Sequence, residues 1–396
     1  MRSEVGPTTA DRRARGAVMA LFVVNGATYN SLVPRFPALR DGLGLSNAEL
    51  GSAIAAFPAA ALLVGVLAGP LIARFGSGRV AASISLLGAL LLPLVAVAPG
   101  WWALAAALFV LGITDAWTDA AMNAQGLVVQ DRYGRSIING LHATWSVAAV
   151  GAGLLGAGAA GLGVPIGWHL GAVAVVLVIV SALAWLFVVP DPPHQASSDS
   201  GSAGVRSVLR SRPAVLGLLA IAGLMVCSGA VEDSSASWGA VYLRDDLGAG
   251  AFVAGLPFVA FQVFMTAGRI GGDRVVDRFG AARVARLGAL VAAVALAVAL
   301  LVAHPVAAVV GWSLAGLGVA TLFPLAFAAA GTVPGVRPGD GIAVVGFLAR
   351  LGFLVTPPVI GAIADASSVG TGLLLVPVAA LGAALLARSL RPRGPS

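Results

Sequence analysis

The chain has 396 residues, of which 59% are hydrophobic and only 10% are charged, and its mean hydropathy is +0.95. A soluble globular protein carries about 25% charged residues, so this composition excludes a chain with an ordinary water-facing surface. The net charge of +7 comes from Arg alone, and the single Cys227 excludes an intrachain disulfide and a cysteine metal site.

A membrane-crossing helix needs about 20 predominantly apolar residues. The apolar runs predict an all-α membrane protein with twelve spans, near residues 17–38, 48–73, 80–98, 102–130, 137–160, 169–189, 214–241, 250–273, 284–303, 306–330, 341–364 and 371–388. The first sixteen residues carry charge but no cleavage pattern, so we expect the first span to remain as an uncleaved helix.

The arginines alternate with the spans. Every second connection is rich in Arg, as seen at residues 12–15, 74–79, 132–135, 206–212, 274–286, 337 and 388–393. Positive residues mark the cytoplasmic side of a membrane protein, so both termini are expected in the cytoplasm. This distribution follows the topology and forms no basic face of the kind that binds nucleic acid, so we expect no nucleic-acid partner.

One long polar segment interrupts the chain. The stretch PDPPHQASSDSGSAG at 190–204 is rich in Pro, Ser and Gly, a composition typical of flexible linkers. It predicts an N-terminal six-helix bundle over 1–189, a cytoplasmic linker over 190–212 and a C-terminal six-helix bundle over 213–396.

The two halves repeat at an offset of 204 residues. This shift pairs LRDGLG at 39–44 with LRDDLG at 243–248, and RFG at 74–76 with RFG at 278–280. It also pairs Gly51 with Gly255, Phe57 with Phe261 and Arg79 with Arg283. Two parallel repeats joined by a linker are typical of one large group of secondary transporters.

The loop between the second and third spans resembles that of the major facilitator superfamily, which reads G-x-L-x-D-R-x-G-R. Here it is GPLIARFGSGR at 69–79, with Ala73 where the family usually has Asp, while the second copy, DRVVDRFGAAR at 273–283, has Asp273 at the Gly position. The resemblance implies that this loop holds the two halves together in the outward-facing state. The candidate residues are Arg74, Gly76, Arg79, Asp277, Arg278 and Gly280.

Further stretches resemble the fucose-permease-like bacterial branch of that superfamily. They are VPRFPALRDGLGLSNAELG at 33–51, DAAMNAQG at 119–126, NGLHATWS at 139–146 and SWGAVYLRDDLG at 237–248. The resemblance implies twelve transmembrane helices in two pseudo-symmetric bundles. It also implies a monomer that moves small molecules, and a central cavity lined by the first, fourth, seventh and tenth spans.

Two acids and an amide lie four residues apart on the fourth span. Asp115, Asp119 and Asn123 therefore form one stripe of a helix. A carboxylate in mid-membrane costs about 2.5–3.5 kcal/mol on insertion scales, so this stripe must face the bundle interior or a wet cavity. Because burial favours a neutral carboxyl group, such a residue can take up and release a proton. Our hypothesis is that Asp119, with Asp115 or Glu232, couples proton movement to solute movement.

Other spans add polar and aromatic groups to the expected cavity. The seventh span carries the consecutive acids Glu232 and Asp233, and His142 near the start of the fifth is a candidate proton relay. The further candidates for lining the cavity are Asn25, Tyr29, Asn30, Asn123, Trp145, Trp238, Thr321 and Phe323. Trp145 and Trp238 have rings that stack well on a sugar or an aromatic solute.

Structural roles compete with each of these assignments. Asp115 or Asp119 could pair with Arg269 or Arg350 to hold the bundle together, and Glu232 and Asp233 approach the outer interface. A lone His near a helix end is often a hydrogen-bonded structural residue, and Trp238 could anchor at the membrane surface.

The sequence favours a secondary active transporter that moves a small organic solute across the plasma membrane by alternating access, with proton coupling. Symport of a polar solute such as a sugar is the leading expectation, and a proton-coupled drug or metabolite efflux antiporter is the alternative. A polytopic membrane enzyme with His142 and Asp119 as an acid–base pair is a distant alternative, since no nucleophile accompanies them. The expected partners are the solute, the proton and the lipid bilayer of the bacterial inner membrane, with no cofactor and no metal.

Overall fold

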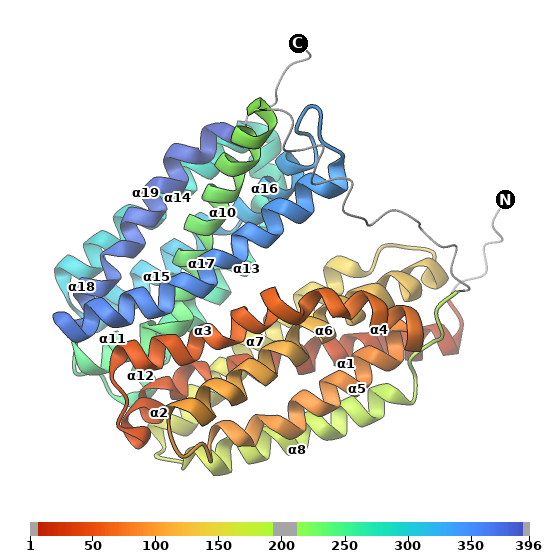
Figure 1. Cartoon of the computed structure of the whole chain (residues 1–396), viewed down its shortest axis with the longest axis horizontal. Helices are drawn as coiled ribbons and strands as arrows, with labels where there is room; N and C mark the ends of the chain where they lie inside the picture. Colours follow the sequence, from red (N-terminus) through yellow and green to blue (C-terminus); the bar gives the residue numbers. More distant parts are fainter. Residues whose placement is uncertain (1–6, 193–211, 391–396) are drawn as a thin grey trace. The chain divides into compact units, whose positions relative to one another are not determined.

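The structure is a computed structural model that describes residues 7–192 and 212–390. Twelve helical stretches of the described chain are long and apolar enough to cross a membrane, as the hydropathy predicted. They divide between two compact units (Figure 1). The N-terminal unit comprises the described residues of Met1–Leu43 and Ala56–Ala196, and the C-terminal unit comprises those of Gly44–Ala55 and Ser197–Ser396.

The first six spans are single helices or chains of short helical segments. They consist of α1 (Thr9–Asn30), η1 (Val33–Arg35) and α2 (Phe36–Leu43); α3 (Asn47–Val64), η2 (Gly65–Leu67) and α4 (Ala68–Phe75); α5 (Ser77–Leu91) and η3 (Leu92–Val95); α6 (Trp101–Tyr133); α7 (Ile138–Gly161); and α8 (Ile166–Trp185). Prolines begin several of these breaks, because Pro lacks the backbone N–H that a continuous helix needs.

The last six spans are built in the same way. They consist of α10 (Arg212–Ser237), followed by the short α11 (Gly239–Asp245); α12 (Ala251–Ala254) and α13 (Leu256–Phe279); α14 (Ala281–Val302); α15 (Pro305–Val319) and α16 (Leu322–Ala330); α17 (Pro338–Ala366); and α18 (Val369–Leu373), α19 (Leu375–Leu386) and η4 (Ala387–Leu390). Pro324 lies in the first turn of α16, so the tenth span breaks at Ala320 and Thr321.

Several expected boundaries differ from the structure by about one helical turn or more, and two of these differences have a clear physical cause. The first helix begins at Thr9, about two turns before residue 17, because Thr8 and Asp11 form a capping box. Asp11 also pairs with Arg132 at the end of α6, at 3.0 Å, so local polar contacts extend this helix beyond its apolar part. The seventh span stops at Ser237, where the backbone breaks at Trp238 before α11.

The sequence repeat is also a repeat of backbone geometry. Gly76 and Gly280 follow α4 and α13 with φ of +87° and +81°, a region that L side chains rarely adopt. The N–H of each glycine donates to the carbonyl four residues earlier, at 2.8 Å in both copies. Helix pairing repeats too, because α1 packs on α7 and α5 on α6 as α10 packs on α17 and α14 on α15.

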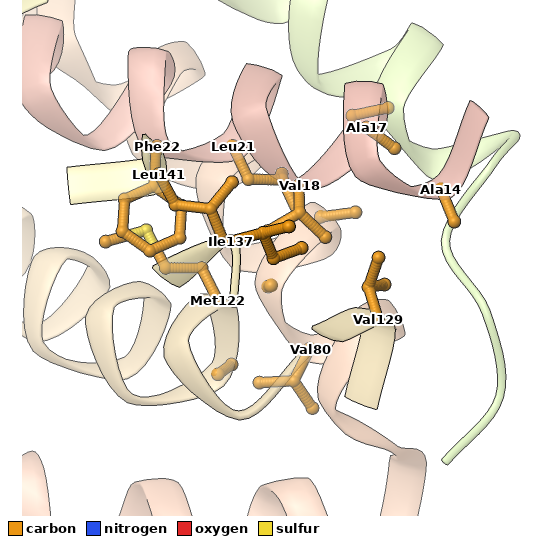
Figure 2. Close-up of a cluster of buried hydrophobic side chains, with 14 of the residues drawn as sticks. Ala14, Ala17, Val18, Leu21, Phe22, Val80, Met122, Val129, Ile137 and Leu141 are labelled. Atoms are coloured by element: carbon orange, nitrogen blue, oxygen red, sulfur yellow. The ribbon is translucent and has the colours of Figure 1, made fainter. Parts of the chain in front are cut away.

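A buried apolar cluster joins five helices of the N-terminal unit, α1, α5, α6, α7 and α8. Figure 2 shows Val18, Leu21 and Phe22 of α1 beside Met122 of α6 and Leu141 of α7. Every one of these five side chains is at most 1% exposed. The cluster fixes α1 against α6 and α7, the three helices that carry the polar candidates of this half.

The start of α3 is held within the C-terminal unit. Asp365, near the end of α17, accepts hydrogen bonds from the backbone N–H groups of Asn47 and Ala48, each at 2.8 Å. The carboxylate thus satisfies two of the N–H groups that a helix leaves unpaired in its first turn. A Cβ on Gly361 would lie 2.4 Å from the Asn47 carbonyl oxygen, so a glycine permits this close approach.

Candidate functional site

Three helices of the N-terminal unit meet at Asn25. Its Nδ2 donates to Asp115 Oδ1 at 2.8 Å, and its Oδ1 accepts a hydrogen bond from Trp145 Nε1, also at 2.8 Å. The chain of contacts therefore runs from α7 through α1 to α6. Three of the residues predicted from different spans, Asn25, Asp115 and Trp145, lie in one network.

Chemistry fixes the direction of this network. An indole N–H can only donate, so the Asn25 oxygen must face Trp145 and the Asn25 amide nitrogen must face Asp115. Asn25 is 8% exposed, and both ends of its amide are thereby satisfied. Gly26 permits the arrangement, because a Cβ there would lie 2.7 Å from the Trp145 carbonyl oxygen.

A small cavity lies beside Asp115. Its volume is about 10 Å³, and its polar lining comes from Asn25, Thr28, Tyr29, Ser85, Thr114, Asp115 and Thr118. A space of this size holds about one water molecule, which needs two to four polar partners. The Ser85 hydroxyl is buried and has no hydrogen-bond partner in the part of the chain that the structure describes, so it is available to such a water. Ser85, Thr114 and Thr118 are not among the residues predicted to line the cavity.

The remaining members of the polar stripe lie farther out. Asp119 is exposed, and Asn123 Nδ2 donates to its Oδ1 at 3.1 Å and to its backbone oxygen at 2.8 Å. The spacing of four residues thus brings the two side chains together as expected. Asp115 itself is half-buried, and none of the ion pairs among the described residues includes it.

Three further candidates of this half have local contacts. The His142 ring lies edge-on to Phe22, with ring centroids 5.2 Å apart, and is exposed. Tyr29 packs against Phe57 at a centroid distance of 4.3 Å. Asn30 is buried and donates to the Gly26 carbonyl of its own helix at 2.7 Å, so one of its two amide N–H groups is already used.

The acids of α10 point in different directions, as expected for consecutive helical residues. Asp233 is 8% exposed; its Oδ1 accepts from the Ser237 hydroxyl at 3.0 Å, whereas its Oδ2 has no partner. Glu232 is half-buried and interacts electrostatically with Arg269 of α13. Arg269 Nε also approaches the Ala320 carbonyl at 3.4 Å, and Arg350 is exposed on α17.

The other candidates of the C-terminal unit are mostly packed. Trp238 is fully buried, and its indole N–H has no hydrogen-bond partner. Phe323 lies 6.2 Å from Phe353, measured between ring centroids. Thr321 occupies the break before α16 and lies beside Gly272, where a Cβ would be 2.7 Å from its methyl carbon.

The loop residues expected from the resemblance form two matching turns. Arg74 and Arg278 each lie over the ring of the next residue, Phe75 or Phe279, at 5.2 and 5.4 Å. Arg79 and Asp277 are exposed. The glycines Gly76 and Gly280 end the preceding helices in the same backbone conformation.

An unexpected carboxylate lies at the first of these turns. Asp191 Oδ2 accepts from the Ser77 backbone N–H at 2.6 Å, and Asp191 Oδ1 is also bonded to the Ser77 hydroxyl. Gln125 of α6 joins them, because its Oε1 lies 2.8 Å from that hydroxyl and its Nε2 donates to Val189 O at 3.1 Å. Asp191 lies in the segment predicted as a linker, of which residues 193–211 are outside the described part of the chain.

Comparisons with solved structures show the same fold. The chain is similar to a bacterial homologue of the human lysosomal transporter Spinster, with a TM-score of 0.78, 14% identity and coverage of 97% of this chain and 98% of that one. It is also similar to the nucleoside transporter NupG, with a TM-score of 0.76, 13% identity and coverage of 97% and 99%. For a structure of the Escherichia coli fucose:proton symporter, the TM-score is 0.62 at 17% identity, with coverage of 96% and 98%.

Sequence comparisons give closer relatives. An uncharacterised MFS-type transporter of Yersinia pestis is 29% identical over 368 residues, which cover 91% of this chain and 92% of the relative. Membrane protein MosC of Rhizobium meliloti is 30% identical over 362 residues, which cover 91% and 86%. The sequence model of the Major Facilitator Superfamily matches residues 18–232 and 224–396. The chain therefore belongs to the major facilitator superfamily, a family of multi-pass membrane transporters.

Proposed function

We propose that the protein moves a small polar solute across the bacterial plasma membrane by alternating access, and that Asp115 carries the coupled proton. The observation that supports this most directly is the network of Trp145, Asn25 and Asp115, beside a cavity the size of one water. The network holds the carboxyl group of a membrane-spanning helix in one position, and none of the described arginines pairs with it.

Proton exchange needs a carboxyl group that is stable in both protonation states. An Arg partner would favour the charged form, whereas burial and a neighbouring acid favour the neutral one. Asp115 has no Arg partner within the described ranges 7–192 and 212–390, and Asp119 lies one helical turn away. Asn25 donates to one oxygen of Asp115 in either state, which leaves the other oxygen to exchange a proton with water in the cavity. Asp119, which is exposed, is better placed to pass that proton on than to retain it.

The chemistry of the surrounding groups favours a polar solute. Amides, hydroxyls, a phenol and an indole lie around Asp115, and they suit a ligand with several hydroxyl groups. The fucose:proton symporter and the nucleoside transporter that share this fold carry such solutes by their names. We therefore propose sugars and nucleosides as the substrate class, proton symport as the mode, and the monomer as the working unit.

The first experiment identifies the solute. Purified full-length protein is heated with fucose, uridine or the lipophilic cation tetraphenylphosphonium, at pH 5.5 and pH 7.5. A ligand that binds the folded state raises the melting temperature by mass action. We expect fucose or uridine to do so, and more strongly at pH 5.5, because symport requires the protonated carrier to bind the solute. Stabilisation by tetraphenylphosphonium alone would contradict the substrate class and favour efflux.

The second experiment tests Asp115 in proteoliposomes with the stabilising solute in radiolabelled form. Wild-type protein should accumulate it when the interior is alkaline. Asp115→Asn keeps the shape but cannot lose a proton, so it should exchange labelled for unlabelled solute without accumulating it. Trp145→Phe keeps the ring and removes the donor, so it should retain accumulation at a rate about tenfold lower, since a released hydrogen bond costs about 1 kcal/mol or more. Full accumulation by Asp115→Asn would remove Asp115 from the coupling role.

A further inference from the structure

An apolar groove runs along the outside of α14 and α15 in the C-terminal unit. Its volume is about 730 Å³. The walls include Leu287, Val291, Val294 and Val298 of α14 with Val310 and Leu314 of α15, and each of these six side chains is at least 36% exposed. Both helices are long and apolar enough to cross a membrane, so in a bilayer this outward-facing groove would meet hydrocarbon.

Small residues create the groove. A Cβ on Gly288 would lie 2.1 Å from the Gly318 carbonyl oxygen, and a Cβ on Gly311 would lie 2.6 Å from the Ala299 Cβ. The two backbones therefore approach closely, as small residues allow in membrane helices. The larger Val and Leu side chains on either side then stand above the contact line and form walls.

The length of the groove matches one lipid chain. From Leu287 to Ala299 the helix rises about 18 Å, at 1.5 Å per residue. The hydrocarbon core of a bilayer is about 30 Å thick, so that one leaflet contributes about 15 Å. A single acyl chain from one leaflet can thus lie along most of the groove.

Positive charge continues the same face at one end. Arg283 and Arg286 are both exposed, and they precede the lining residues Leu287 and Leu290 by four positions each. Side chains four apart on a helix lie above one another, so both guanidinium groups are in line with the groove. Neither Arg283 nor Arg286 takes part in an ion pair among the described residues, and α14 and α15 contain no acid.

We propose that this groove binds one anionic phospholipid, with an acyl chain between α14 and α15 and the phosphate against Arg283 and Arg286. A zwitterionic lipid has the same acyl chains but lacks the net negative charge that the two arginines attract. Topology alone accounts for arginines near a cytoplasmic helix end. It does not account for their alignment with the groove wall, which begins one helical turn farther along α14.

The experiment measures lipid retention by native mass spectrometry. Purified full-length protein is stripped of lipid and offered equal amounts of phosphatidylglycerol and phosphatidylethanolamine with identical acyl chains. We expect one retained phosphatidylglycerol per chain. In the double variant Arg283→Gln with Arg286→Gln, the preference for phosphatidylglycerol should fall about thirtyfold. Each arginine near an anionic surface contributes about 1 kcal/mol, or slightly more than fivefold, and the two factors multiply.

A second variant blocks the apolar part. Val294 is 61% exposed on the groove wall, so Val294→Trp can fill the groove without disturbing the interior, and it should weaken retention of both lipids. Arg388→Gln is the matched control, because Arg388 is exposed in η4 and does not line the groove. An unchanged preference in the double variant, or unchanged retention in Val294→Trp, would overturn the proposal. So would a dimer that Val294→Trp dissociates, since a second copy would then be the occupant.

Discussion

The two halves of the molecule share their packing but not their polar chemistry. A Cβ on Gly112 would lie 2.2 Å from the Phe57 carbonyl oxygen, and at the equivalent place in the other half a Cβ on Gly316 would lie 2.3 Å from the Phe261 carbonyl oxygen. Yet Asp115 accepts a hydrogen bond from the Asn25 amide, which in turn accepts one from Trp145. The buried Asp233, in contrast, has one carboxylate oxygen with no hydrogen-bond partner among the described residues. The repeated positions are those where backbones touch, and the diverged positions carry the polar candidates.

The turns before α5 and α14 show the same contrast on a smaller scale. Both have a glycine with positive φ and an Arg over a Phe ring. Only the first has a carboxylate at the start of its helix, where Asp191 bonds to Ser77. Asp277 of the second turn is exposed and has no hydrogen bond among the described residues. The family usually has an acid at position 73, and here the chain has Ala73 with Asp191 nearby.

The largest expected effect would test whether the packing is truly shared. Gly112→Ala and Gly316→Ala each force a Cβ against a backbone carbonyl, which must separate two helices. Overpacking of this kind costs about 1–3 kcal/mol and sometimes more, so both variants should lower the melting temperature in detergent, by similar amounts.

Gly151→Ala serves as the control for this pair. Nothing lies within 4 Å of a Cβ at Gly151, and Ala is the better helix former by about 1 kcal/mol. The control should therefore be neutral or slightly stabilising. If Gly316→Ala lowered the melting temperature much less than Gly112→Ala, the two contacts would have the same geometry but would not contribute equally to stability.

An effect of intermediate size should distinguish the turn before α5 from the matching turn before α14. Asp191→Ala removes an acceptor from the first turn of α5, and loss of such a cap costs about 0.5–2 kcal/mol. Asp277→Ala, in the matching turn, should change stability by less than about 0.5 kcal/mol, as exposed surface substitutions usually do. Melting curves of both variants against wild type provide the measurement, and equal losses would contradict the assignment of Asp191 as a cap.

The smallest effect concerns the paired arginines of the turns. Arg74→Gln and Arg278→Gln each remove a cation from an exposed Phe ring, an interaction worth about 0.5–1 kcal/mol at such sites. Both should lower the melting temperature slightly and equally, and Arg74→Lys should recover part of the loss. A large effect from only one of them would mean that its guanidinium has a role beyond its own turn.

Most of the fold was predictable because the membrane imposes it. Apolar runs of sufficient length gave the twelve spans, and the offset of 204 residues located turns that the structure shows in the same conformation, as at Gly76 and Gly280. The start of α1 was not found, because hydropathy ignores the capping box that carries the helix beyond its apolar part. The cytoplasmic location of both termini remains a prediction from the arginines.

For the candidate site, the sequence indicated residue types and spans but not the contacts between them, and its role stays a prediction. The spacing of Asp115, Asp119 and Asn123 placed them on one face. Only the packing of α1 against α6 and α7 shows that Asn25 bonds to Asp115 and not to the other two, and that Trp145 bonds to Asn25. Asp191 was missed because it lies in a Pro-rich polar stretch that is typical of linkers. Its one signal was the missing acid at Ala73, followed by a Ser at the start of a helix.

The fixed orientation of the Asn25 amide makes that residue a built-in reporter. Its nitrogen faces Asp115 and its oxygen faces Trp145, so the carboxamide and indole resonances of an isotopically labelled sample probe opposite ends of one side chain. Protonation of the Asp115 carboxyl group would shift the Asn25 carboxamide resonance, and displacement of α7 would shift the Trp145 indole resonance. A single amide can thereby distinguish chemistry from motion in a spectrum of the intact protein.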